Sequence, residues 1–233
     1  MSNNPLSLVL PIFIEPKKAF EEILKKGHVW FPLLVLSLVS AGMLYWYFQT
    51  VDFPWLLDQM IAAQPDMKAD AKEVFLKMMS RTMMTWSSVV VVLVGVPLMA
   101  AVGAAYLTIC AKMIGSELRF EKWFAFAAWA MMPSLIGTLL MGVQIASSNG
   151  QVTPEGLDML SVNYLFAHQD HLSSWGKFFD KLSMTSFWTI FVSFVGLRTW
   201  TDRSTATCAT IAALPYVVIF GGWAAYLLAF AKN

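Results

Sequence analysis

Four uncharged apolar runs, each long enough to cross a membrane, alternate with shorter polar segments along the chain. They cover residues 30–48, 83–110, 123–145 and 204–230. An α-helix rises ~1.5 Å per residue and a bilayer core is ~30 Å thick, so about 20 apolar residues suffice for one span. Trp30 begins the first run and Tyr45, Trp46 and Tyr47 close it, as expected of side chains at the two membrane interfaces. The pattern predicts four transmembrane helices.

A fifth span is predicted over residues 183–200, although its uncharged part ends at Leu197. Orientation supports it. With five spans and a cytoplasmic N-terminus, nine of the sixteen Lys and Arg residues fall on the cytoplasmic side, in agreement with the positive-inside rule. Arg198 and Arg203 lie on that side only if this segment crosses. We therefore predict an all-α integral membrane protein, a five-span helical bundle with amphipathic interfacial helices.

Two polar connections have the periodicity of interfacial helices. Residues 15–27 begin with Pro16 near a first helical position and end at Gly27, a favoured cap, and they carry one apolar face with Glu and Lys opposite. A helix on the inner membrane surface is predicted here, and a short solvated linker is the alternative. The loop over residues 49–82 has a similar helical stripe. We divide the chain into an N-terminal cytoplasmic or interfacial segment, 1–29, and a membrane domain, 30–233.

Composition and charge narrow the classes of function. The chain has 233 residues, 58% of them apolar and 13% charged, and its formal net charge is +1. Nucleic acid is not expected as a partner, because phosphate binding needs a clustered excess of Lys and Arg. Cys110 and Cys208 are too few for a disulfide scaffold. The apolar residues 5–14 precede their lysines instead of following them, so we predict a retained segment and no signal peptide.

Candidate catalytic and metal-binding side chains are sparse. The cores of the five predicted spans hold no ionisable residue, which argues against a proton-coupled pump. His168 and His171 flank Asp170 in the loop 146–182 and are compatible with a zinc or copper site, but solvated loop histidines are the favoured interpretation. The methionines of residues 78–84 suggest a copper site only weakly, because methionine is common throughout the chain. We expect no enzymatic activity and no catalytic, cofactor-binding or metal-binding residues.

Prolines and glycines inside the apolar runs are the more informative signal. A proline frees a backbone carbonyl and bends a helix, while small residues let helices approach closely. The predicted kink and packing residues are Pro97, Pro133, Pro215, Gly95, Gly103 and Gly137. Either the kinks are static features of packing, or the bundle can open for a lipid or solute.

Two short stretches make the chain resemble the bacterial Yip1 family of membrane proteins. The first is the N-terminal Ile-Phe-Ile-Glu-Pro-Lys-Lys-Ala-Phe-Glu-Glu-Ile, with Pro16 and Phe20. The second follows the second span as an inner hairpin with Gly115, Glu117 and Phe120. Pro133 and Pro215 fit prolines of the family's third and last spans. The resemblance covers nearly the whole chain.

The resemblance implies a helical bundle in the bacterial cytoplasmic (inner) membrane, multi-pass, with its N-terminus in the cytoplasm. Eukaryotic relatives act with small GTPases, but this sequence lacks their Asp-Leu-Tyr-Gly-Pro motif, so GTPase binding is not carried over. We predict a non-enzymatic membrane-organising or interaction protein, with membrane lipids, copies of itself or other membrane proteins as partners. The alternative is a lipid-translocating or small-solute transporter-like bundle.

Overall fold

The computed structural model describes residues 4–64 and 66–230, and the regular elements in this part of the chain are helices. An isolated bridge joins Ser161 to Ser183. The prediction of an all-helical fold is confirmed. The ends of the two predicted domains, residues 1–3 and 231–233, lie outside the described residues.

Among residues 4–64 and 66–230, four stretches are long and apolar enough to cross a membrane, which makes the chain a multi-pass membrane protein. They are α3 (Trp30–Thr50), α6 (Arg81–Met113), the stretch Phe120–Ser147 and α11 (Thr205–Phe230). Each corresponds to one of the four long apolar runs in the sequence.

The stretch Phe120–Ser147 has a break inside it, at the proline that the sequence predicted as a kink within the span 123–145. It consists of α7 (Phe120–Ala130) and α8 (Ser134–Ser147), and Pro133 lies buried in the turn between them. Proline has no backbone N–H to donate and its ring collides with the preceding turn, so a helix readily ends beside it.

The segment predicted as a further span, residues 183–200, forms α10 (Met184–Thr201), which has 18 residues. Such a helix is about 27 Å long, close to the thickness of a bilayer core. Serine and threonine recur along it, and it is not among the four stretches that are apolar enough by composition. The count of five spans is therefore approximate, and the crossing of α10 stays a prediction.

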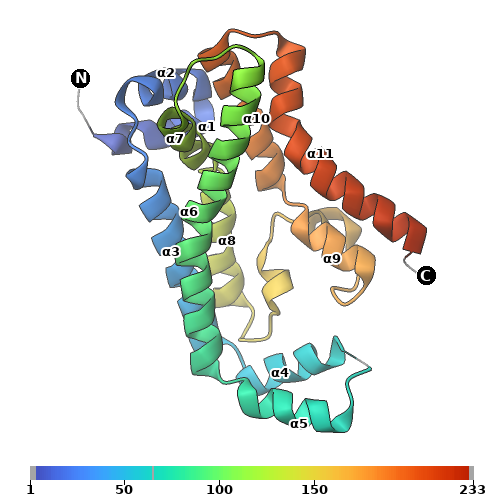
Figure 1. Ribbon diagram of the computed structural model, residues 1–233. Coiled ribbons are helices and arrows are strands. Elements are labelled where there is room, and N and C mark those ends of the chain that lie inside the picture. Colours follow the sequence, from blue (N-terminus) through green and yellow to red (C-terminus); the bar gives the residue numbers. More distant parts are fainter. Residues whose placement is uncertain (1–3, 65, 231–233) are drawn as a thin grey trace. The chain divides into compact units, whose positions relative to one another are not determined.

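The chain divides into two compact units, and residues 1–37, 95–135 and 184–233 form the first. Its described part holds the start of α3, the end of α6, and α7, α10 and α11. Three short N-terminal helices complete it: η1 (Pro5–Leu8), α1 (Val9–Ile14) and α2 (Pro16–Lys26). Helix α2 lies against α7 and α10 (Figure 1).

Helix α2 has the predicted bounds but a different neighbour. Pro16 stands in its first turn, and Gly27, at φ 82°, caps its C-terminus in a backbone conformation that suits glycine. Its apolar residues Ala19, Phe20 and Ile23 are fully buried within the first unit. These three side chains therefore do not rest on the membrane surface as expected. A periodic pattern reveals an apolar face without showing whether lipid or protein covers it.

The second unit comprises residues 38–94 and 136–183. It contains the end of α3, the start of α6, most of α8, and further short elements: α4 (Phe53–Ala62), α5 (Ala69–Met78), η2 (Pro154–Leu157), η3 (Asn163–Ala167) and α9 (Ser174–Lys181). The helical stripe predicted over 49–82 is thus realised as α4 and α5. Leu56 of α4 is fully buried, while α5 buries none of its side chains.

The C-terminal end of α3 is fixed by two polar side chains of the second unit. The Arg81 guanidinium donates to the carbonyl of Phe48 and, at 3.1 Å, to that of Val51. The Tyr47 hydroxyl donates to the carbonyl of Val152 at 2.8 Å. The last carbonyls of a helix lack partners within it, so a cation placed there stabilises the helix end.

Candidate functional site

Four aromatic rings from three helices form one buried cluster in the first unit. We call Phe20 of α2, Trp123 and Phe126 of α7, and Trp200 of α10 the aromatic cluster. Phe20 stacks on Phe126 with 4.5 Å between ring centroids, and Phe126 meets Trp200 edge to face at 5.0 Å. Phe20, Trp123 and Phe126 are fully buried, and Trp200 is 8% exposed. Each such ring pair contributes about 0.5–1.5 kcal/mol beyond the burial of its area.

Two side chains of this site hold the backbone of α2. Trp200 Nε1 donates to the carbonyl of Phe20 at 2.9 Å, and Lys122 Nζ donates to the carbonyl of Leu24 at 2.5 Å. Leu24 lies in the last turn of α2, where carbonyls lack helical partners and a cation is favoured.

A third donor holds the residue that follows the cap of α2. Trp129 Nε1 donates to the carbonyl of His28 at 3.2 Å, and His28 itself has a positive φ of 38°. The three accepting carbonyls, at Phe20, Leu24 and His28, are spaced by four residues. Helix α2 is thus fixed through its main chain as well as through its apolar face.

Gly196 of α10 makes the approach of these rings possible. A Cβ atom at this position would lie 2.6 Å from Phe126 Cε2 and 2.7 Å from Phe20 Cε2. Real Cβ atoms do not come this close to ring carbons, so any larger residue would displace one of the two rings. Only glycine allows α10 to pack against α2 and α7 at this distance.

The residues singled out from the sequence reach different places. Phe20 lies in the aromatic cluster, and Pro16 opens α2. Gly115, at φ 76°, makes the turn after α6, while Glu117 and Phe120 are exposed at the start of the following segment.

The predicted kink and packing residues do not converge on one site. Pro97 and Pro215 lie inside α6 and α11, and Pro133 lies at the break before α8. A Cβ on Gly103 would lie 3.6 Å from that of Ala127, whereas Gly95 has open space around it; Gly137 is half-buried in α8. Their roles as hinges or contacts stay predictions.

Most of the aromatic cluster escaped sequence reasoning. In the sequence, Trp123 stood out only as the first residue of a predicted span, and Trp200 as the last residue of another. The available signal was the pair Gly196 and Trp200, because a glycine one turn before a tryptophan permits close approach of another helix. This signal gives no partner, since the contacting residues are far apart in the chain.

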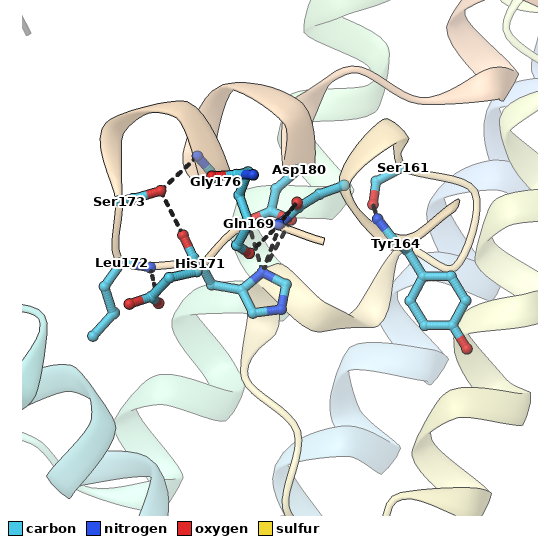
Figure 2. A network of polar contacts seen from close by, with 10 residues as sticks. Ser161, Tyr164, Gln169, His171, Leu172, Ser173, Gly176 and Asp180 are labelled. Carbon is cyan, nitrogen blue, oxygen red and sulfur yellow. Dashed lines mark hydrogen bonds and ion pairs between the residues drawn. The ribbon is translucent and has the colours of Figure 1, made fainter. Parts of the chain in front are cut away.

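A cluster of polar side chains orders the loop before α10 in the second unit. We call Asn163, His171 and Asp180 the loop cluster. His171 Nδ1 lies 3.0 and 2.9 Å from the two carboxylate oxygens of Asp180, whose side chain is only 1% exposed. Asn163 Nδ2 donates to Asp180 Oδ1 at 2.8 Å, and Asn163 Oδ1 accepts from the backbone N–H of Gln169 at 2.7 Å. Figure 2 shows the ring of His171 turned towards Asp180.

This loop cluster differs from the metal site considered for the two histidines. His171 is paired with Asp180, while His168 is exposed, with a positive φ of 47° at the end of η3. In the described part of the chain, no group of three His, Cys, Asp or Glu side chains could hold a metal ion. The hydroxyl of Ser173 is engaged with the loop backbone. The cluster's contacts serve to hold residues 163–180 in one shape.

Removing the buried carboxylate should loosen this loop. We expect Asp180→Ala to lower the free energy of unfolding by about 1–3 kcal/mol, because Asn163 and His171 lose their shared acceptor. The matched control is Asp58→Ala, at an exposed position of α4, with an expected change within about 0.5 kcal/mol. Denaturation in detergent micelles gives the free energies, and hydrogen exchange over residues 161–183 localises the effect. Equal costs for both variants would contradict the structural role.

Comparison with known proteins adds a family match over most of the chain. The family described as the Yip1 domain matches residues 11–227, a range that includes α2 and the whole aromatic cluster. No curated protein and no solved structure matches the chain significantly.

Proposed function

The chain belongs to the Yip1 domain family, and on that premise we propose that it is a non-enzymatic membrane-organising protein that binds other membrane helices, a second copy of itself among them. The observation that carries this proposal is an uncovered face on α11. Val218, Gly221, Gly222 and Ala225 share one side of this helix at helical spacing, and all four are exposed.

The opposite side of the same helix is better covered. It carries a row of large side chains that are half-buried or buried: Tyr216, Phe220, Trp223 and Leu227. A Cβ on Gly221 or Gly222 would meet no atom within 4 Å. The two glycines therefore leave room beside α11 that the described residues of the first unit do not fill.

Association of helices in a membrane favours such a face. Lipid tails are as apolar as leucine, so helices associate through close packing, which small residues allow. Glycine costs about 1 kcal/mol relative to alanine in a helix interior. A Cβ at Gly221 or Gly222 would meet no atom of the described residues within 4 Å, so packing inside the first unit does not explain why glycine stands there. A second helix packed on the two glycines would explain it, and this supports an interaction role.

Cysteine crosslinking tests this face with a closely matched pair. Val218 and Val217 are 62% and 63% exposed but point in directions about 100° apart around the helix. In a background with Cys110→Ala and Cys208→Ala, we expect oxidation of native membranes to give several-fold more disulfide dimer with Val218→Cys than with Val217→Cys. Chains that stay monomeric in both variants, or crosslink equally, would count against association of copies through this face.

The break at Pro133 supports an alternative function, translocation of lipids or small solutes. Helices broken at membrane depth occur in transporters, where the freed backbone groups line a cavity or are buried in protein. In this chain the break falls within one of the four apolar stretches. Purified protein in liposomes should then accelerate the transfer of fluorescent phospholipids between leaflets or release entrapped solutes. Rates equal to those of empty liposomes would exclude this alternative.

A further inference from the structure

The first helices of the chain carry an apolar stripe that the described residues of the first unit leave exposed. Leu6, Leu10 and Ile14 follow one another at four-residue spacing through η1 and α1, and they are 62%, 64% and 63% exposed. On the other side, Leu8 and Ile12 are buried in the core of the first unit. Side chains four residues apart share one side of a helix, so the stripe is continuous.

This segment is too short to cross a bilayer. The ten residues Pro5–Ile14 form a short apolar helix of about 15 Å, half the thickness of a bilayer core. It is nevertheless tied to the membrane. Helix α2 ends at Lys26 and α3 begins at Trp30, so the two ends lie within about 14 Å of each other. Trp30 is 69% exposed at the start of a transmembrane stretch, a position typical of the interface.

A groove lined by apolar and charged residues lies beside the stripe. It lies between η1–α1 and α2, has a volume of about 270 Å³, and is lined by Ser7, Lys18, Glu22 and Lys26 among others. Lys26 pairs with Glu22 at 3.1 Å, and its hydrogen bond holds the pKa of the Glu22 carboxyl below its ordinary value. Lys18 pairs with Glu15 at 3.3 Å, and both side chains are more than half exposed. An exposed pair of this kind is worth little, so the ammonium group of Lys18 can turn to a phosphate, whereas the side chains of Lys26 and Glu22 are only 26% and 23% exposed and stay paired.

We propose that η1–α1 lies in the lipid interface of the bilayer, with Leu6, Leu10 and Ile14 among the acyl chains and the neighbouring Lys18 at the phosphates of phospholipids. The apolar stripe, the adjacent cation of Lys18 and the short link from α2, which follows α1 directly, to α3 all fit this occupant. Moving one large apolar side chain from water into an apolar environment is favourable by about 1.5–3 kcal/mol, and each residue of the stripe would lose this gain if it stayed in water. The inference is independent of the α11 face and is tested separately.

Site-directed fluorescence distinguishes lipid from other occupants. The full chain, with Cys110→Ala and Cys208→Ala, receives a single cysteine at Leu10 that carries an environment-sensitive dye. It is reconstituted in phosphatidylcholine vesicles, with and without phosphatidylglycerol, whose acyl chains are brominated near the headgroup. The matched control is Lys17→Cys, an exposed polar position of α2.

We expect at least twofold stronger quenching by brominated lipid at Leu10 than at Lys17, with the same result at Leu6 and Ile14. Vesicles that contain phosphatidylglycerol should strengthen quenching at Leu10, because the phosphate of this lipid, unlike that of phosphatidylcholine, has no cationic headgroup beside it, and its net negative charge attracts Lys18. Two outcomes would overturn the proposal: quenching at Leu10 no stronger than at Lys17, or crosslinking of Leu10→Cys to another protein chain without quenching by lipid.

Discussion

Replacing Phe20 with alanine is expected to destabilise the first unit by about 3–5 kcal/mol, the cost of truncating a buried aromatic side chain. The ring is fully buried and stacks on Phe126 at 4.5 Å. Its loss would leave a cavity between α2, α7 and α10, since the backbone of α2 is held in place by Trp200. The free energy of unfolding in detergent micelles, followed by tryptophan fluorescence, measures this cost.

The same substitution at an exposed ring is the control. Phe120 is 44% exposed and stacks on Phe124, so Phe120→Ala should cost about 1 kcal/mol, the value of one aromatic pair. The rate of trypsin cleavage at the lysines of α2 measures local opening of this helix, because α2 should unfold more often when it no longer packs on the aromatic cluster. If Phe20→Ala were no more costly than Phe120→Ala, or left trypsin cleavage unchanged, α2 would not depend on the aromatic cluster.

The positions of the long helices could be predicted from the sequence because their signal is local. Residues 30–48 and 204–230 differ by at most two residues at either end from α3 and α11. Runs of uncharged apolar residues suffice for this result, since backbone polar groups in lipid must be paired within the helix. A kink at Pro133 was predicted, but the turn over residues 131–133 that separates α7 from α8 was not.

The surroundings of each helix could not be predicted in the same way. The apolar face of α2 and the apolar stripe of α1 look alike in sequence, yet one is buried in protein and the other is exposed. The aromatic cluster joins Phe20 to Trp200 across almost the whole chain, and no local pattern encodes such a contact. The pairing of His171 with Asp180 is likewise invisible in a loop without periodicity.

Gly196→Leu is expected to cost about 3 kcal/mol, at the upper end of the range for overpacked cores. Its first added atom would already lie within 3 Å of the rings of Phe20 and Phe126, and both rings are held by further aromatic neighbours. Leucine is a better helix former than glycine by nearly 1 kcal/mol, so the steric cost must exceed this gain. The expected structural result is displacement of α2, with loss of the hydrogen bond from Trp200 to Phe20.

The control for this variant is Gly95→Leu, in α6, where a Cβ meets open space. At this position leucine brings its higher helix propensity but no steric clash. We therefore expect a free energy of unfolding within about 1 kcal/mol of the parent chain. Unfolding in detergent micelles compares the two variants, and trypsin cleavage of α2 shows whether the loss is local. Because Gly196 contacts α2 and α7 from α10, accelerated cleavage in Gly196→Leu alone would show that this glycine keeps α2 attached. Equal stability of the two leucine variants would mean that the rings can move aside at little cost, and that α2 is held mainly by the hydrogen bonds from Trp200 and Lys122.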